Sequence, residues 1–295
     1  MAVQMRVFAL IMALAGVPTA ISAATAGRSD VLHFLPAGAH LLRAPVWARL
    51  ARGAPEAAVV FFAYRAEKSP SASAYVEVLK REGAGLRPVW RLDCHGAYPS
   101  FHTDSGVYDI NHTGRPKIVV DCAGTTVCPN FFGIFQYAHG GIVPVPADFQ
   151  PLHTCRVKLA DLGSSATPEI INYPYGYKLP EIYHWNGFQY ARDDGAFPHF
   201  WAQYGSSLLG IGKDTHATPI PVLVGACRNA LIIFRLARER KKGPVVCAAA
   251  RGRIADGKAL WRYTGQTEEQ FKREQENAIS AINALLKNGD AAVTN

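Results

Sequence analysis

The sequence predicts an α+β protein, in which an N-terminal domain of antiparallel β-repeats with blade-like sheets precedes a small, disulfide-tied helical domain. Three observations lead to this class. Short apolar strands separated by glycine- and proline-containing turns recur between residues 55 and 195. After residue 195 the apolar residues recur with helical spacing, and six cysteines follow an N-terminal export signal. We expect the two domains to cover residues 27–195 and 196–295.

The stretch 107–122, VYDINHTGRPKIVVDC, shows the repeated unit most clearly. It predicts a strand, a polar turn and a second, β-branched strand. Asp109, Asn111 and Thr113 stand at alternate positions before Gly114. Short Asp and Asn side chains accept hydrogen bonds from nearby amides and thereby close tight turns. Oxygen ligands at alternate positions before a glycine also build calcium loops. Both interpretations stay open, and we expect the hydrogen-bonded turn rather than bound calcium.

The unit recurs 52 residues further on, in the stretch 157–173, VKLADLGSSATPEIINY. There Asp161 takes the place of Asp109 and Pro168 that of Pro116. A fainter copy, PEAAVV, covers residues 55–60 and has no acidic turn before it. Each copy is followed by two apolar runs around a turn, which predicts a hairpin. The expected turn residues are Gly83, Gly140, Gly141, Asn186 and Gly187.

Residues 109–120, DINHTGRPKIVV, resemble the FG-GAP/VCBS-type repeats of integrin-like β-propellers. The signature of that family is an Asp-x-Asp-x-Asp-Gly loop followed by Pro-Asp-Ile-Val-Val. The resemblance covers residues 50–195 and implies blade-like sheets whose loops often bind calcium. The copy at Asp161 has lost most of the ligand positions. About three repeats are too few to close a propeller, so we expect an incomplete one whose end the helical domain covers.

Four helices are expected in the C-terminal part, because its apolar residues follow a helical period. They cover residues 197–209, 222–241, 246–261 and a stretch that opens at Thr267. Thr267 and Gln270 have the spacing of a capping box. Gly243 is expected to end the second helix. Near the N-terminus, residues 31–35 are expected to form a short strand.

Residues 1–26 have the layout of a secretory signal, with Arg6, an apolar run over 7–17 and a small-residue cleavage site at 24–26. Cleavage after Ala23 is the alternative. The apolar run is too short to span a bilayer. We expect export to the periplasm or the extracellular space.

The six cysteines of an exported chain are expected to form disulfides rather than a metal site. Fifteen connectivities exist for six cysteines. Proximity in the sequence favours Cys122–Cys128 and Cys227–Cys247, which leaves Cys94 and Cys155 for each other.

No catalytic motif stands out in the sequence, and we expect no catalytic residue. His95, His102 and His112 lie near Asp93, Asp104 and Asp109. These six residues offer an alternative, a secreted hydrolase, which requires His95, His102 and Asp109 to converge in a pocket.

Two further groups of side chains are candidates for binding. Aromatic residues crowd into the stretch 173–190, and Tyr175, Tyr177 and Trp185 are the candidates for a ligand-binding face. The formal net charge is +8. Basic residues gather at the end of the second expected helix, where they complement the helix dipole and offer weak contact with an anionic surface. They are Arg235, Arg238, Arg240, Lys241 and Lys242.

Taken together, these features predict an exported, non-enzymatic binding or structural protein. It presents loops of the β-repeat domain to a protein or glycan partner of the cell envelope. No nucleic-acid partner and no transmembrane segment are expected.

Overall fold

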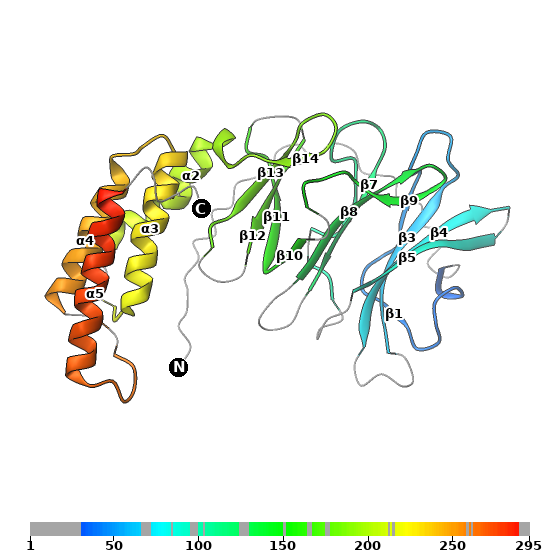
Figure 1. Ribbon diagram of the computed structural model, residues 1–295. Helices are drawn as coiled ribbons and strands as arrows, with labels where there is room; N and C mark the ends of the chain where they lie inside the picture. The colour runs from blue at the N-terminus through cyan, green and yellow to red at the C-terminus, as the bar shows by residue number, and fades with distance from the viewer. Residues whose placement is uncertain are drawn as a thin grey trace.

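Three antiparallel sheets follow one another along the chain, and a group of helices follows the third sheet (Figure 1). The computed structural model describes residues 31–65, 72–83, 85–94, 100–102, 104–123, 130–149, 152–163, 167–174, 178–211, 213, 216–257, 260 and 262–288. The combination of antiparallel sheets and helices is an α+β architecture, as the sequence predicts. The signal-like stretch 1–26 lies outside the described residues.

The first sheet has five strands. Four of them are in the order β1-β3-β4-β5, and the fifth, β2, pairs with the part of β3 that β1 does not reach. Its strands are β1 (His40–Leu41), β2 (Val46–Ala48), β3 (Ala57–Tyr64), β4 (Ser73–Glu82) and β5 (Gly85–Cys94). The central strand β3, AAVVFFAY, is buried over seven of its eight residues. A strand that is apolar at consecutive positions must bury both of its faces.

The second and third sheets have the same meander of antiparallel strands. In the second sheet the strand order is β10-β8-β7-β6, and β9 also pairs with β8. The strands of this sheet are β6 (Gly106–Tyr108), β7 (Lys117–Cys122), β8 (Asn130–Ala138), β9 (Gly141–Pro144) and β10 (Leu152–Thr154). The third is ordered β11-β12-β13-β14; its strands are β11 (Arg156–Ala160), β12 (Glu169–Tyr173), β13 (Glu181–Trp185) and β14 (Tyr190–Arg192).

The hairpins that the sequence predicts are present in all three sheets. They join β4 to β5, β8 to β9 and β13 to β14. Their turn glycines Gly83, Gly140 and Gly187 have positive φ, which L-residues with a Cβ rarely adopt.

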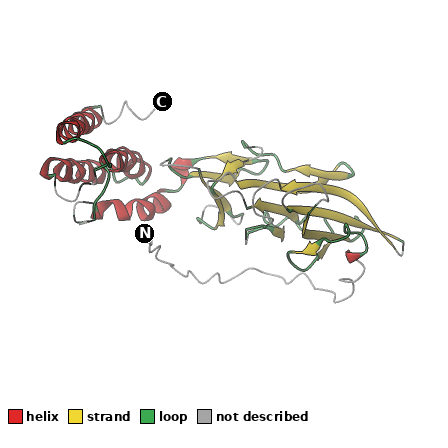
Figure 2. Cartoon of the chain, turned by 90° about the horizontal axis from the view of Figure 1, so that it is seen from below, coloured by secondary structure: helices red, strands yellow, loops and turns green. Residues whose placement is uncertain are grey.

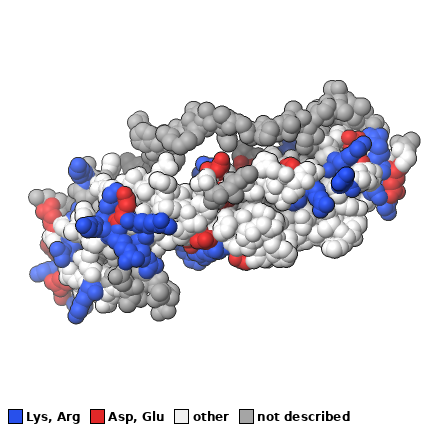
Figure 3. Space-filling model, turned by 90° about the horizontal axis from the view of Figure 1, so that it is seen from above, with Lys and Arg blue, Asp and Glu red and all other residues white. Residues whose placement is uncertain are grey.

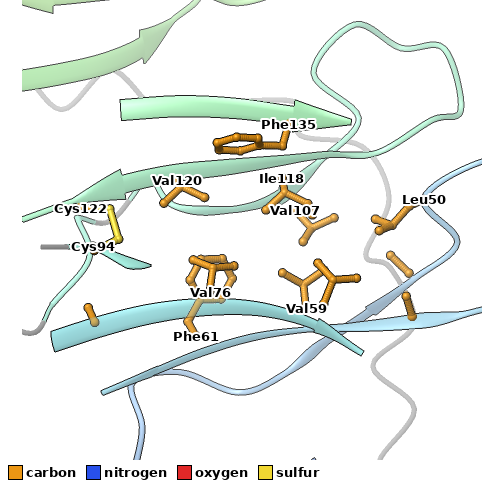
Figure 4. Packing of buried hydrophobic residues seen from close by; sticks show 14 residues of the cluster. Leu50, Val59, Phe61, Val76, Cys94, Val107, Ile118, Val120, Cys122 and Phe135 are labelled. Atoms are coloured by element: carbon orange, nitrogen blue, oxygen red, sulfur yellow. A yellow bond between two sulfur atoms is a disulfide. The ribbon is translucent and has the colours of Figure 1, made fainter. Parts of the chain in front are cut away.

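The sheets pack face to face, and apolar side chains fill both gaps between them. Figure 4 shows Val59, Phe61 and Val76 of the first sheet opposite Val120 and Ile118 of the second. The other face of the second sheet meets the third. That second core contains Val119, Phe132, Ile134, Ile170 and Tyr183.

The faint first copy, residues 55–60, differs from the other two copies in the direction that its side chains face. Matching Pro55 to Pro116 equates Ala57 with Ile118. However, Ala57 faces the second sheet whereas Ile118 faces the first, so the two side chains point in opposite directions along the stack. In the second and third copies the equated residues Ile118 and Ile170 both face the preceding sheet. A shift of one residue exchanges the two faces of a strand.

Both ends of the stack are covered. On the outer face of the first sheet, Val31 and Leu35 pack against Ala58, Val60 and Phe62. The expected strand at residues 31–35 is therefore wrong: the segment is a helical turn, in which Phe34 N donates to Val31 O. At the other end the helices cover the third sheet, as expected: Ile182 of β13 shares a core with Trp201 and Phe234.

The helices form a bundle at one end of the molecule, seen from below in Figure 2. They are η1 (Asp194–Ala196), α2 (Pro198–Gly205), η2 (Ser206–Gly210), α3 (Ile220–Leu236), α4 (Lys242–Asp256) and α5 (Glu268–Lys287). The capping box of α5 is confirmed, because Thr267 accepts from Gln270 N and Gln270 accepts from Thr267 N. None of the helices within the described ranges has the length and apolarity that a membrane crossing requires.

The expected role of Gly243 is wrong. Helix α3 ends at Leu236, and Gly243 lies buried in the first turn of α4. A Cβ at this position would lie 3.1 Å from Leu231 Cα and 3.3 Å from Ala230 O. Gly243 therefore allows α4 to approach the backbone of α3 closely.

Two disulfides are defined by the structure. Cys227–Cys247 joins α3 to α4, as predicted. Cys94–Cys122 joins the end of β5 to the end of β7, so it ties the first sheet to the second and replaces the expected Cys122–Cys128 and Cys94–Cys155 pairs. Proximity in the sequence failed here because face-to-face packing brings strands 28 residues apart within bonding distance. Cys155 is also disulfide-bonded, and Cys128 lies outside the described residues.

The close approach of α3 and α4 makes opposite predictions for two glycines of α4. Alanine has a higher helix propensity than glycine by about 1 kcal/mol. Gly252→Ala should raise the free energy of unfolding by about 0.5–1 kcal/mol, because Gly252 is exposed and open space surrounds it. Gly243→Ala should lower it by about 1–2 kcal/mol, because overpacking costs more than the propensity returns. Urea unfolding of both variants measures this, and an equal rise in both would contradict the packing.

Candidate functional site

The acidic turn between β6 and β7 closes on its own hydrogen bonds. Asp109 Oδ1 accepts from Thr113 N at 3.0 Å and Asp109 Oδ2 accepts from Gly114 N at 2.7 Å. Thr113 Oγ1 donates to Asn111 Oδ1 at 3.0 Å. All three candidate calcium ligands thus take part in the turn itself. Within the described part of the chain, no group of three or more His, Cys, Asp or Glu residues is placed to hold a metal ion.

The corresponding turn between β11 and β12 is built in a related way. Asp161 Oδ1 accepts from Gly163 N at 2.8 Å, and Glu169 Oε2 accepts from Leu162 N at 2.8 Å. Glu169 is the first residue of β12 and is fully buried. Lys117 has the equivalent place in β7 and is also buried. Burial lowers the pKa of Lys117, and the nearby carboxylate of Asp109 partly opposes that shift.

Of the described histidines in the alternative hydrolase reading, His112 lies beside Asp109 and His102 lies away from it. His102 N donates to Asp121 O near the end of β7, whereas Tyr108, next to Asp109, pairs with Lys117 at its start. Four residues of an extended strand span about 13 Å. His112 lies in the turn itself with φ 50°, and His95 lies outside the described residues.

The aromatic residues of the stretch 173–190 divide between core and surface. Tyr183 and Tyr190 are buried, and burial raises the pKa of both hydroxyls. Trp185 is half-buried, with its ring centroid 5.4 Å from that of Tyr190, so it packs with the core. Phe188 is 73% exposed. Tyr175 and Tyr177 lie outside the described residues.

The turn that carries Phe188 is braced by polar side chains. Asn186 Oδ1 accepts from Phe188 N and Gln189 N at 3.0 and 2.9 Å. Asp148 accepts from Gln189 Nε2 at 2.8 Å and from Arg192 N at 3.0 Å. An exposed aromatic ring is therefore held on a turn with fixed backbone geometry. The Asn-Gly pair predicts the turn, but only the structure shows that Phe188 is its exposed residue.

Asp121 is a buried carboxylate that the sequence analysis missed. It lies in β7 on the face of Val119, toward the third sheet, and is 1% exposed. Its Oδ1 has no hydrogen-bond partner among the described residues. Burial, and secondarily the negative charge of Asp104, raise the pKa of Asp121 to about 7. The signal available in the sequence was an aspartate inside the apolar run IVVDC.

Ser105 and Arg43 enclose the backbone beside Asp121. Ser105 Oγ accepts from Asp121 N at 2.8 Å and donates to Asp121 O at 3.1 Å. Arg43 donates to Ser105 O and, at 3.3 Å, to His102 O. The guanidinium carbon of Arg43 lies 4.9 Å from the centroid of the Phe61 ring. Arg43 therefore links the first sheet to the loop before β6 by both polar and cation–π contacts.

The basic residues near the end of α3 occupy the connection to α4. Arg235 lies in the last turn of α3, and the other four follow the helix. Together with Glu239 they line a hollow of about 590 Å³. A second hollow, between the first and second sheets beside Leu50, Val78 and Tyr137, holds only about 60 Å³. It is far below the volume of about 300 Å³ at which small-molecule sites begin.

The comparisons with known proteins do not place this chain in a class. No protein family model, no curated protein and no solved structure matches it. What the chain does is therefore argued from its own residues.

The hydrogen bonds of Asp109 predict the behaviour of Asp109→Ala. The variant leaves two turn amides without their acceptor, so the free energy of unfolding should fall by about 1–2 kcal/mol. The loss should be equal in calcium and in chelator, because the carboxylate serves the turn. Thermal melts of both proteins with and without millimolar calcium measure this. A calcium-dependent rise in the melting temperature of the wild type that the variant lacks would show a bound ion instead.

The burial of Asp121 predicts a pH dependence of stability. The pKa in the folded state, about 7, is above the ordinary value of 3.8, so the native state holds this proton more tightly than the unfolded chain. The stabilisation is complete below about pH 4 and is lost as the pH rises through about 7, by roughly 4 kcal/mol in all. Asp121→Asn should lack this decline in urea unfolding. Asp104→Asn should move the decline to lower pH, and parallel pH profiles for wild type and Asp121→Asn would contradict the assignment.

Proposed function

We propose that this chain is an exported, non-enzymatic binding protein whose β-repeat domain presents its loops to a protein or glycan partner of the cell envelope. The observation that carries the proposal is the braced turn of Phe188, an exposed aromatic ring on a backbone fixed by Asn186 and Asp148. Rigid aromatic side chains supply much of the binding energy at protein and glycan interfaces.

The polar residues of the acidic turns support a non-catalytic role. The carboxylates of Asp109 and Asp161 accept hydrogen bonds from backbone amides of their own turns. A general acid or base instead needs a carboxylate directed at a substrate within hydrogen-bond reach. Export is supported by the signal-like stretch 1–26 and by the Cys94–Cys122 and Cys227–Cys247 disulfides, which persist in oxidising compartments.

The proposal includes an incomplete propeller of FG-GAP-like repeats. It is supported by three stacked sheets with hairpins at corresponding places, and by an acidic turn before the middle strands β7 and β12. The helices on the third sheet and the turn at residues 31–35 then take the places of the missing blades. We infer that hydrogen bonds, not calcium, close the turns.

Phe188→Ser tests the role of the braced turn. The mature protein is screened against immobilised envelope glycans and purified envelope proteins, and the variant should bind at least about ten-fold more weakly to the partner found. Its free energy of unfolding should stay within about 0.5 kcal/mol of wild type, because the ring is exposed. Tyr263→Ser, at a 49% exposed aromatic in the helical part, is the matched control and should bind normally.

The hydrolase alternative has its own readout in the same study. The wild type is assayed with ester, peptide, glycoside and phosphodiester reporter substrates. Turnover that disappears in His102→Ala would replace the binding proposal with the catalytic one. Equal partner binding by Phe188→Ser and wild type would remove the turn from the proposal.

A further inference from the structure

The connection between α3 and α4 gathers positive charge around a hollow. Figure 3 shows Lys and Arg gathered at the helical end of the molecule and, mixed with acidic residues, at the opposite end. The hollow of about 590 Å³ is lined by one acidic residue, Glu239, and five basic ones, which we call the basic turn: Arg235, Arg238, Arg240, Lys241 and Lys242. All of the basic residues except Arg235 are exposed.

The helix dipole does not explain these charges. Cations stabilise the C-terminus of a helix and destabilise its N-terminus. Only Arg235 lies in the last turn of α3. Lys241 and Lys242 stand at the N-terminus of α4, whose first turn has no acidic residue and no side-chain cap. Their positive charges therefore add to the positive end of α4 instead of opposing it, so the helix dipole does not account for Lys241 and Lys242.

Arg238 shows a second conflict with stability. It has φ 61°, and Glu239 N donates to Phe234 O at 2.7 Å across it. This is the left-handed position that ends many helices, where glycine is favoured because it has no Cβ. The chain has an arginine at a place where glycine would strain the backbone less. Backbone preference therefore does not account for an arginine at this position.

The neighbouring carboxylate neutralises the basic turn only in part. Glu239 Oε1 lies 2.8 Å from Lys242 Nζ. Across the described residues, Arg235, Arg238, Arg240 and Lys241 have no carboxylate within salt-bridge distance. Four unpaired cations around one concave space attract a compact anion, and a planar guanidinium can donate two parallel hydrogen bonds to one.

We propose that the basic turn binds a phosphate group carrying two negative charges, as in a phosphate monoester or a pyrophosphate. Such a group presents several oxygens to several donors at once, whereas a single carboxylate would satisfy one guanidinium. The hollow is open to solvent, so a phosphate group can approach it directly. The group can belong to a lipid headgroup or to a soluble compound. This inference does not depend on the binding role proposed for the turn of Phe188.

The test uses the mature protein and two probes. Pyrophosphate is titrated calorimetrically, and phosphatidylcholine vesicles with and without phosphatidate are tested by sedimentation. We expect pyrophosphate to bind, with an affinity that falls as salt screens the charges. We expect phosphatidate vesicles to bind if the headgroup can reach the hollow. Pyrophosphate should then displace them.

Arg238→Gly separates binding from folding. The substitution removes one charge and relieves the left-handed arginine, so the variant should melt at a higher temperature than wild type while its dissociation constant for pyrophosphate rises at least about ten-fold. The matched control is Lys272→Ala in α5. Lys272 lies near the opposite end of α4, where Gln275 bonds to Ile254 O, about 20 Å from the basic turn. It should bind pyrophosphate as wild type does.

The outcomes are decisive in both directions. Binding of both probes that Arg238→Gly weakens places a phosphate site in the hollow. Binding of vesicles alone, lost in the same variant, assigns the site to a lipid phosphate, and binding of pyrophosphate alone assigns it to a soluble one. The proposal is overturned if neither probe binds at low salt, or if Arg238→Gly and Lys272→Ala both bind like the wild type.

Discussion

The structure depends on one constraint: each of its three sheets is apolar on both faces. The central strand β3 shows this most plainly, because Val59 and Phe61 face the second sheet while Val60 and Phe62 face outward. Such a sheet cannot end a stack, since exposing one face would return a large apolar area to water. The helical turn at residues 31–35 and the α2–α3 layer are the covers that this constraint demands.

Polar side chains of the β region supply hydrogen bonds to backbone groups beside the packed strands. Asp109 and Asp161 satisfy amides in the turns that lead into β7 and β12. The hydroxyl of Ser105 hydrogen-bonds to both N and O of Asp121, at a place where β6 no longer pairs with β7. Asp121 is the exception, because its Oδ1 has no partner among the described residues and its site favours the protonated acid. A buried, unsatisfied group of this kind weakens the sheet as the pH rises.

The two proposed binding features, the turn of Phe188 and the basic turn, lie on different parts of the protein. The first would bind through apolar contact and the second through charge. The turn of Phe188 offers apolar area on a backbone that is already ordered, so little conformational entropy is lost on binding. The basic turn offers charge that is largely unpaired, and two of its lysines stand at a helix N-terminus where positive charge is unfavourable. Polar contacts join the third sheet to α2 between them: Arg192 pairs with Glu181 and Asp194, and Trp201 Nε1 donates to Asp194 O at 2.6 Å.

Much of the local structure could be predicted from the sequence, although residues 31–35 form a helical turn instead of the expected strand. Alternating apolar residues, turn glycines and the Thr267 capping box predicted the hairpins and helices, because these depend on neighbours in the chain. The three-dimensional packing sets which faces meet. It paired Cys94 with Cys122, moved Gly243 from a helix end to a helix contact, and buried Asp121 between sheets. Each of these follows from stacking elements distant in sequence, and a single chain's local pattern does not encode which strands come into contact.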